Sequence, residues 1–371
     1  MTPVHRPPGR TPPGSLPDDR RLHDHAALDP VASLMLDEAG DLSGRVLVLD
    51  DVDGALTREV ERRGAEVRAW CDDVRDQANL PRRLVLPQMP DTTWIPDLVL
   101  WRLPRAVAAV ADLGEGLASW LPAHARVVAG GRIKHMTLAQ NAALERSFAT
   151  VQASLGRQKS RVIHASGPRP SSPRWPRRRF LPEAGITLIS RGNVFSANKI
   201  DGGTHLLIRT LERVSPTPAD SGSRPAQGVA IDFGCGTGII ASWLALRGYA
   251  VTGIDVSQAA IQSTLLTAAA NQVQVGTRRA DGLGRTPSGS ATIIVSNPPF
   301  HRGAAKDSRA TLAMIARAGQ VLRPGGELWL VYNSHLPYLP LLREQVGITT
   351  IEARDRSYLV TRSLTNPDYD G

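Results

Sequence analysis

A short polar and aromatic stretch, SNPPF at residues 296–300, directly follows the apolar run 291–295. The amide oxygen of Asn297 and the main-chain carbonyl oxygen of Pro298 can accept both hydrogens of a planar amine. Phe300 can stack on the ring that carries the amine, and the prolines add no competing N–H donor. The stretch therefore predicts catalysis at an exocyclic nitrogen. The alternative is a plain turn at the end of a strand, since Asn-Pro dipeptides mark turns.

A glycine-rich stretch, DFGCGTG at residues 232–238, lies between an apolar run and a helical pattern. Glycines let the chain turn sharply and let a ligand approach the backbone, and the helix that follows offers free N–H groups. The dinucleotide fingerprint has its third glycine one residue later. We therefore expect Asp232, Gly234, Gly236 and Gly238 to hold a ligand with an amino-acid end.

Two further acids follow the next predicted strands in order. Asp255 ends the second strand, where a carboxylate accepts hydrogen bonds from the hydroxyls of a ribose. Asp281 follows the third strand and is placed to accept from an adenine amino group, although an aspartate in a turn has the same appearance. The glycine loop and these acids together predict a cofactor that contains a nucleoside.

Apolar runs alternate with helical patterns along most of the chain, which predicts parallel β-α-β units. In the first half we expect strands at 45–51, 65–70, 97–101 and 125–131, with helices at 54–64, up to 120, and at 137–150. In the second half we expect strands at 228–234, 250–257, 291–300 and 326–333, with helices at 238–248, 258–272 and 310–322. The runs 349–355 and 357–363 predict a closing antiparallel pair. The predicted fold class is α/β.

The two halves resemble copies of each other. A shift of 184 residues places 46–67 on 230–251 and puts Gly54 on a glycine. Asp50 and Val52, however, fall on the first two glycines of the later loop. The first half is therefore expected to have lost its ligand loop, unless the match is a chance alignment of two β-α-β units.

The composition is basic, with 44 Lys+Arg against 35 Asp+Glu and a formal net charge of +9. Such an excess favours polyanionic partners. Residues 146–182 hold no acid, and their arginines and Trp175 fit an RNA contact by phosphate binding and base stacking; the alternative is a solvated surface. The two cysteines are too few for a disulfide framework and favour a reducing, cytoplasmic setting. Neither a membrane span nor a signal peptide is evident.

The glycine loop, Asp255 and the NPPF stretch resemble class I S-adenosylmethionine-dependent methyltransferases. In such enzymes the loop passes under the methionine part of S-adenosylmethionine, and the second-strand acid binds its ribose. The stretches 193–211, 297–301 and 331–342, together with the degenerate first half, resemble the bacterial ribosomal RNA guanine-N2 methyltransferases. This resemblance implies methyl transfer to the exocyclic N2 amine of a guanine in ribosomal RNA, with the large-subunit enzyme slightly favoured.

The resemblance also implies roles for residues outside the two motifs. Phe195, Ser196 and Asp201 would line the mouth of the cofactor site, although this segment lacks the glycine of the family pattern and its basic residue has moved. The residues expected to bind RNA are Pro299, His301, Asn333, His335, Arg177, Arg178 and Arg179. Binding of a guanine would require the base to leave its stack.

The expected fold is two Rossmann-like methyltransferase domains, the first degenerate and the second catalytic, with a mostly parallel sheet ending in an antiparallel pair. The expected boundaries are a disordered lead at 1–25, a degenerate RNA-binding domain at 26–165, an Arg/Pro-rich linker at 166–185 and the catalytic domain at 186–371. We expect a cytoplasmic monomer that uses no metal and no membrane.

Three alternatives remain open from the sequence. A protein glutamine N5-methyltransferase acting on a translation factor shares the Asn-Pro-Pro-aromatic pattern, but it usually has Tyr at position 300 and a small helical N-terminal domain. A non-catalytic RNA-binding protein on the same fold would not need the intact loop and acid of the second half. A nicotinamide-dependent dehydrogenase is disfavoured by the glycine spacing.

Overall fold

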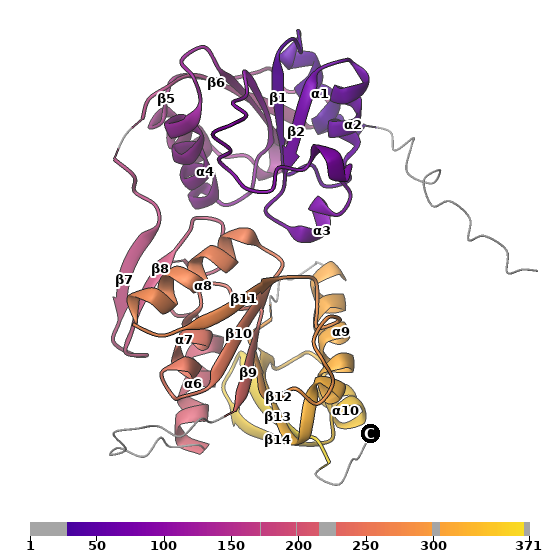
Figure 1. Ribbon diagram of the computed structural model, residues 1–371, viewed down its shortest axis with the longest axis vertical. Helices are drawn as coiled ribbons and strands as arrows, with labels where there is room; N and C mark the ends of the chain where they lie inside the picture. Colours follow the sequence, from indigo (N-terminus) through magenta and orange to yellow (C-terminus); the bar gives the residue numbers. More distant parts are fainter. Residues whose placement is uncertain (1–27, 171, 198, 215–227, 299–304, 367–371) are drawn as a thin grey trace, which may run out of the picture.

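The computed structural model describes residues 28–170, 172–197, 199–214, 228–298 and 305–366. For 305–308 it describes the backbone alone, and the expected disordered lead at 1–25 lies outside the described residues. Two α/β domains lie one above the other along the long axis of the molecule (Figure 1). In the described part of the chain, no helix has the length and apolar character needed to cross a membrane.

The first domain is built on a six-stranded sheet. Its strands are β1 (Arg45–Leu49), β2 (Glu66–Trp70), β3 (Leu98–Arg102), β4 (Arg126–Arg132), β5 (Phe148–Ala153) and β6 (Ser160–Pro168), in the order β2-β1-β3-β4-β6-β5. Strands β1 to β4 are parallel, and β6 is antiparallel to both β4 and β5. The helices are α1 (Pro30–Ala39), α2 (Ala55–Arg62), α3 (Val74–Gln77), α4 (Val107–Trp120) and α5 (Leu138–Glu145), with short 3-10 turns η2 (Arg82–Leu84) and η3 (Ile133–His135).

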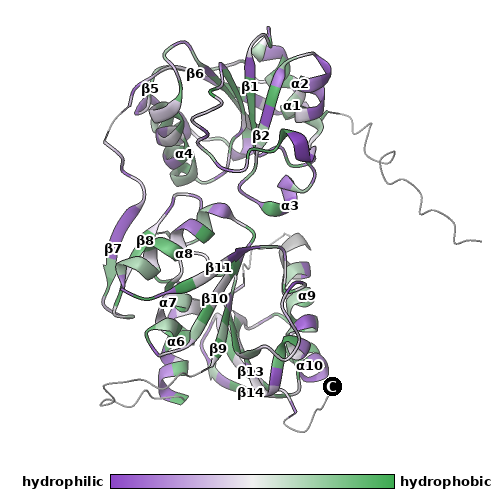
Figure 2. Cartoon of the chain, in the orientation of Figure 1, coloured by the Kyte–Doolittle hydropathy of each residue, from purple (hydrophilic) through white to green (hydrophobic). Residues whose placement is uncertain are grey.

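Strand β1 is buried on both faces, as expected for a central parallel strand. Val46 and Val48 pack into the core that α1 and α2 cover, whereas Leu47 and Leu49 pack into the core under α4 and α5. Figure 2 shows the same arrangement as apolar strands inside a more polar outer layer. Residues 46–49 of β1 are therefore all apolar because helices cover both sides of the sheet.

The second domain repeats this plan with one strand more. Its strands are β9 (Val229–Phe233), β10 (Ala250–Asp255), β11 (Val275–Arg279), β12 (Ala291–Ser296), β13 (Leu322–Asn333), β14 (Ile348–Arg354) and β15 (Tyr358–Leu364), in the order β11-β10-β9-β12-β13-β15-β14. Helices α6 (Gly202–Val214), α7 (Ile239–Ala245) and α8 (Gln258–Ala270) share one core, and α9 (Ala305–Val321) and α10 (Leu339–Gln345) share the other. The predicted antiparallel closing pair is confirmed as β14 and β15.

The pairing registers of the two domains match, as the 184-residue shift predicts. Arg45 pairs with Glu66 between β1 and β2, and Val229 pairs with Ala250 between β9 and β10, which is the same register shifted by 184. The strand orders coincide once β11 is left out. Gly54 and Gly238 cap the following helices with closely similar left-handed backbones, at φ 72° and 78°.

Two local predictions differ from the structure. The helix expected over 137–150 ends at Glu145, and β5 begins at Phe148 because that side chain fills the core and the strand pairs with β6. The expected linker contains β7 (Arg177–Leu181), which pairs with β8 (Ile186–Ser190). The apolar residues of β8 pack against α8, so this pair belongs to the second domain.

The two domains meet through corresponding loops. The N–H of Val74 donates to the carbonyl of Val256, and the N–H of Gln258 donates to the carbonyl of Asp72, each at 2.9 Å. A shift of 184 residues converts one bond into the other, so the junction has an approximate two-fold symmetry. Corresponding surfaces facing each other are the geometry of a symmetric dimer.

A second contact joins α4 to the chain that follows β8. Asp112 on α4 accepts the N–H of Gly192 at 2.7 Å and forms an ion pair with Arg191 at 2.8 Å. A Cβ atom at residue 192 would lie 2.1 Å from the carbonyl oxygen of Ala108. The close packing of this junction therefore requires glycine at position 192.

We expect Gly192→Ala to lower the free energy of unfolding by about 1–3 kcal/mol, because the added methyl group overpacks the junction. The matched control is Gly116→Ala on the exposed face of α4, where a Cβ meets no atom within 4 Å. That control should raise the free energy of unfolding by about 0.5–1 kcal/mol through helix propensity. Denaturant titration of the three proteins measures both, and equal stability of Gly192→Ala and the parent would contradict the packing argument.

Candidate active site

The glycine loop joins the C-terminal end of β9 to the start of α7, and its three glycines have different roles. Gly234 and Gly236 have φ angles of 75° and 52°, and a Cβ built on Gly234 meets no atom within 4 Å. A Cβ on Gly238 would lie 2.6 Å from the Cα of Thr264 on α8. The first glycine therefore leaves open space for a ligand, a Cβ on the second would have its nearest neighbours at 3.8 and 3.9 Å, and the third lets two helices pack closely.

Asp255, at the C-terminal end of β10, reaches back to this loop. Its Oδ2 accepts the N–H of Gly236 at 3.0 Å, and its Oδ1 accepts the N–H of Ser257 at 3.0 Å. Each carboxylate oxygen can accept one more hydrogen bond. Burial raises the pKa of this carboxyl. The fixed carboxylate fits the two hydroxyls of a ribose.

Asp232 lies beneath the loop with only 1% of its surface exposed. Its Oδ2 accepts the N–H of Ala241 in the first turns of α7 at 2.8 Å, and its buried Oδ1 has no hydrogen-bond partner in the described part of the chain. Burial raises the pKa of this carboxyl to about 8. A buried carboxyl with an unused acceptor matches the amino group of an amino-acid ligand.

The side chain of Asn297 is held from behind. Strand β12 is parallel to β9, and Ser296 pairs with Phe233, so Asn297 follows β12 beside the start of the glycine loop. Its Nδ2 donates to Oδ1 of Asp201 at 3.0 Å and to Oγ1 of Thr204 at 2.8 Å. A carboxylate can only accept, so the NH₂ group of the amide must face Asp201. The amide oxygen therefore remains as the acceptor for a substrate.

The start of α6 supplies this support. Asp201 caps the helix by accepting the N–H groups of Gly203 and Thr204, and the hydroxyl of Thr204 donates to its Oδ2 at 2.6 Å. A Cβ at Gly203 would lie 3.3 Å from both Oδ1 of Asn297 and the ring of Tyr358. The sequence prediction includes Asp201 but misses the roles of Gly203, Thr204 and Tyr358. The signal was an aspartate cap with threonine three residues later, DGGT. Only the fold reveals that its partner is Asn297, which follows β12.

The segment that carries Phe195 lies over the glycine loop. A Cβ at Gly236 would be 3.9 Å from Cγ1 of Val194, which places this chain beside the loop. Phe195 itself is 66% exposed. Ser196 has a φ of 56° and donates its hydroxyl to the carbonyl of Lys199 at 3.0 Å. The fold therefore brings the predicted mouth segment to the predicted loop.

The remaining predicted contacts lie farther along the same edge or outside the described residues. Asp281 is exposed, two residues after β11. Asn333 ends β13 opposite Tyr358 of β15, and His335 is exposed in the turn that follows. Pro298 is buried. The predicted residues Pro299, Phe300 and His301 lie outside the described part of the chain.

The arginines of β7 form an exposed basic row, but the tryptophan before them is not free to stack on a base. Arg177, Arg178 and Arg179 are all exposed, and β7 is hydrophilic along most of its length (Figure 2). Trp175 is only 5% exposed, and the guanidinium of Arg177 covers its ring at 4.2 Å. The prediction that Trp175 stacks on a base is therefore wrong, because its ring is already packed.

The first domain has other residues at the corresponding positions. Asp50 occupies the place of the first loop glycine and uses its carboxylate to accept the N–H of Asp72 at 2.9 Å. Burial raises the pKa of Asp50 to about 7. Cys71 replaces the ribose acid, and Arg102, paired with Asp29 at 2.7 Å, is the last residue of β3, the strand that corresponds to β12. The first domain has therefore lost each of the three features that form the site in the second.

Comparison with known proteins gives the same division of the chain. The family model of the RLMG N-terminal domain matches residues 17–169, and that of the methyltransferase small domain matches residues 185–362. The second match covers the glycine loop, Asp255 and Asn297. Fold and site thus define a methyltransferase in the second domain.

Similar proteins extend the match with methyltransferases over both domains. The ribosomal RNA large subunit methyltransferase G of Streptomyces coelicolor is 32% identical over 346 residues, covering 87% of this chain and 89% of that protein. The corresponding protein of Stutzerimonas stutzeri is 31% identical over 86% and 87%. The chain belongs to the family of ribosomal RNA large subunit methyltransferase G proteins.

Proteins named for the other ribosomal subunit are similar as well. The ribosomal RNA small subunit methyltransferase C of Chromohalobacter salexigens is 39% identical over 181 residues, or 49% of this chain and 52% of that protein. The 16S rRNA guanine-N2 methyltransferase of T. thermophilus, solved in complex with AdoMet and guanosine, has a TM-score of 0.73 and 25% identity, covering 91% of this chain and 92% of that chain.

The raised pKa of Asp232 predicts a pH-dependent effect of Asp232→Asn. The folded chain keeps this proton between the ordinary pKa of 3.8 and about 8, whereas the unfolded chain loses it, so the parent loses stability as pH rises through this range. The neutral amide avoids this loss. We expect the variant and the parent to unfold at similar denaturant concentrations near pH 4, and the variant to be the more stable at pH 8. A difference in the free energy of unfolding between variant and parent that stays constant from pH 4 to pH 9 would contradict the raised pKa of Asp232.

Proposed function

We propose that the chain transfers a methyl group from S-adenosylmethionine to the exocyclic N2 amine of a guanine in ribosomal RNA, with large-subunit RNA as the favoured substrate. The observation that carries the proposal is the orientation of Asn297, whose amide oxygen is the free acceptor beside the glycine loop. The family of the chain and the guanosine complex of its structural relative support guanine as the base.

The residues of the second domain fit S-adenosylmethionine. The open space over Gly234 admits its methionine part, the unused Oδ1 of Asp232 matches its amino group, and Asp255 matches its ribose. Asp281 is proposed to accept from the adenine, and Phe195 to line the mouth. When bound, S-adenosylmethionine supplies a sulfonium methyl whose C–S bond breaks as a C–N bond forms, leaving a neutral thioether.

Asn297 is proposed to prepare the amine for this transfer. The nitrogen lone pair of a guanine N2 amine is delocalised into the ring, which makes it a weak nucleophile. Acceptance of one N–H by the Asn297 oxygen, and of the other by the carbonyl of Pro298, favours a tetrahedral nitrogen whose lone pair points at the methyl. Phe300 is proposed to stack on the base. The nitrogen then loses one proton to water, so the product is a neutral secondary amine.

The surrounding RNA is proposed to bind to basic surface. Arg177, Arg178 and Arg179 are exposed on β7, and arginine forks fit phosphate oxygens. His301, Asn333, His335 and Pro299 are proposed to border the flipped guanine. Binding of this kind weakens steeply with salt. Such an RNA is available in the cytoplasm, which is the proposed location.

Small-subunit RNA is the second candidate substrate. The 39% identity with a small subunit methyltransferase C and the likeness to a 16S rRNA enzyme favour it. Incubation with labelled S-adenosylmethionine and each purified subunit, or its naked RNA, from a strain that lacks this gene distinguishes the two. Mass spectrometry then identifies the nucleotide, and label found in protein alone would refute RNA methylation.

We expect Asn297→Ala to lower kcat at least about a hundredfold, since one acceptor at the reacting nitrogen is lost. The dissociation constant for S-adenosylmethionine should stay within about threefold, because the proposed cofactor contacts remain. Thr204→Val should lower kcat less, and Thr204→Ser should restore it, because serine retains the hydroxyl that holds the amide. Single-turnover kinetics measures these effects, and an Asn297→Ala protein with most of the parental rate would refute the amide role.

We expect Asp255→Ala to weaken S-adenosylmethionine binding by about 1–3 kcal/mol, the scale of lost hydrogen bonds to a charged group. Isothermal calorimetry measures this change. Asp91→Ala is the control, because it removes a partly exposed aspartate of the first domain that bonds Thr93. Unchanged affinity in Asp255→Ala would show that this acid does not bind the ribose.

A further inference from the structure

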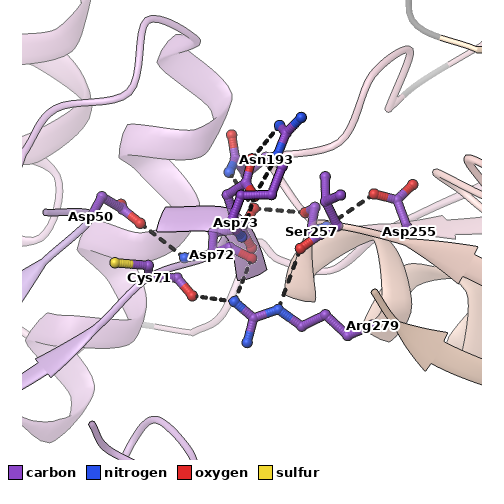
Figure 3. Close-up of polar contacts among 10 residues, drawn as sticks. Asp50, Cys71, Asp72, Asp73, Asn193, Asp255, Ser257 and Arg279 are labelled. Carbon is purple, nitrogen blue, oxygen red and sulfur yellow. Dashed lines mark hydrogen bonds and ion pairs between the residues drawn. The ribbon is translucent and has the colours of Figure 1, made fainter. Parts of the chain in front are cut away.

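One carboxylate of the first domain lies between the two chain segments that border the glycine loop of the second. Asp72, two residues after β2, is 9% exposed and accepts three hydrogen bonds from the second domain (Figure 3). The donors are the hydroxyl of Ser257 at 2.6 Å, the N–H of Ala259 at 2.8 Å and Nδ2 of Asn193 at 2.8 Å.

These donors belong to two chain segments that border the proposed cofactor site. Ser257 donates its own N–H to Oδ1 of Asp255, so Asp72 holds the residue that orients the ribose acid. Asn193 directly precedes Val194, which lies over Gly236. The carboxylate of Asp72 thus links the chain segment that follows β10 to the chain segment that precedes α6.

Asp72 is itself fixed by its surroundings. Its N–H donates to Oδ1 of Asp50 at 2.9 Å, and its carbonyl accepts the N–H of Gln258 at 2.9 Å. Arg279, at the end of β11, donates to the carbonyls of Cys71 at 2.6 Å and Asp72 at 2.9 Å, as Figure 3 shows. Both domains therefore hold the chain at residues 71 and 72 in place, and the carboxylate of Asp72 has a defined direction.

The three contacts require a side chain at position 72 that accepts hydrogen bonds and donates none. All three groups that face the carboxylate are an O–H or an N–H, and one belongs to the first turn of α8, where unpaired N–H groups favour negative charge. An asparagine at position 72 would offer one oxygen and turn an NH₂ group toward a donor. An alanine would leave all three donors without this acceptor.

We propose that Asp72 is a positioning residue, supplied by the degenerate domain, that sets the affinity of the catalytic domain for S-adenosylmethionine. This inference rests on the proposed function, because the proposed function assigns the cofactor to the glycine loop and Asp255. The first domain then has a role in the reaction beyond contact with RNA: it completes the support of a site that the second domain does not build alone.

The test compares Asp72→Ala and Asp72→Asn with the full-length parent. We expect Asp72→Ala to raise both the dissociation constant and the KM for S-adenosylmethionine about tenfold, with kcat at saturating cofactor within about threefold. Asp72→Asn should give an intermediate increase, because one acceptor oxygen remains. A purely structural role would lower the thermal midpoint while leaving the KM of the folded protein unchanged.

Asp73→Ala is the matched control. Asp73 is the neighbouring aspartate, and its carboxylate bonds Arg75 within the first domain. Its main-chain pairing with Ser257 does not depend on the side chain. This variant should keep the parental affinity for S-adenosylmethionine, and an effect equal to that of Asp72→Ala would overturn the specific role of Asp72.

Two further variants keep the proposal testable if the Asp72 variants do not fold. Asn193→Ala and Ser257→Ala each remove one of the three donors, and each should weaken S-adenosylmethionine binding about threefold or more. Parental affinity in both would refute the inference. A parent protein that neither binds S-adenosylmethionine nor methylates ribosomal RNA would instead refute the proposed function, so the two failures are distinguishable.

Discussion

Parallel pairing of β9 with β10 and β12 is the constraint on which the site depends. Because these strands run the same way, their C-terminal ends meet at one edge of the sheet, and the residues that follow them become neighbours. The glycine loop, Asp255 and Asn297 come from three separate stretches of sequence, yet each is the continuation of one of these strands. Helices cover both faces of this sheet, so its central strands are mostly apolar.

Residues whose role follows from their own strand and turn were predictable from the sequence. The loop glycines and Asp255 belong to this group, since strand, turn and helix each leave a local pattern. Thr204 and Asp72 were not predictable, because their partners lie far away in sequence and only the fold brings them together. The edge pair β5 and β6 was missed for the same reason: pairing and the burial of Phe148 outweigh the helical pattern.

The two domains differ most at the strand ends that form the candidate site in the second domain. In the first, the carboxylate of Asp50 occupies the loop and is bonded to the chain itself, and Arg102 is held by Asp29. In the second, the corresponding loop is bare backbone over open space. The same sheet therefore serves as a support in one domain and as a ligand platform in the other, with side chains at a few strand ends making the difference.

The approximate two-fold relation between the domains has a consequence for how the chain could diverge. In a dimer of identical subunits, any substitution at such a contact appears in both subunits at once. An acidic residue introduced there would therefore be present on both sides of the contact. Covalent fusion removes that restriction. Here Asp72 is an aspartate while its counterpart Val256 is apolar, so the side-chain contact runs in one direction only. Because both domains belong to one chain, corresponding positions can carry different residues, and one domain can act as a scaffold for the other.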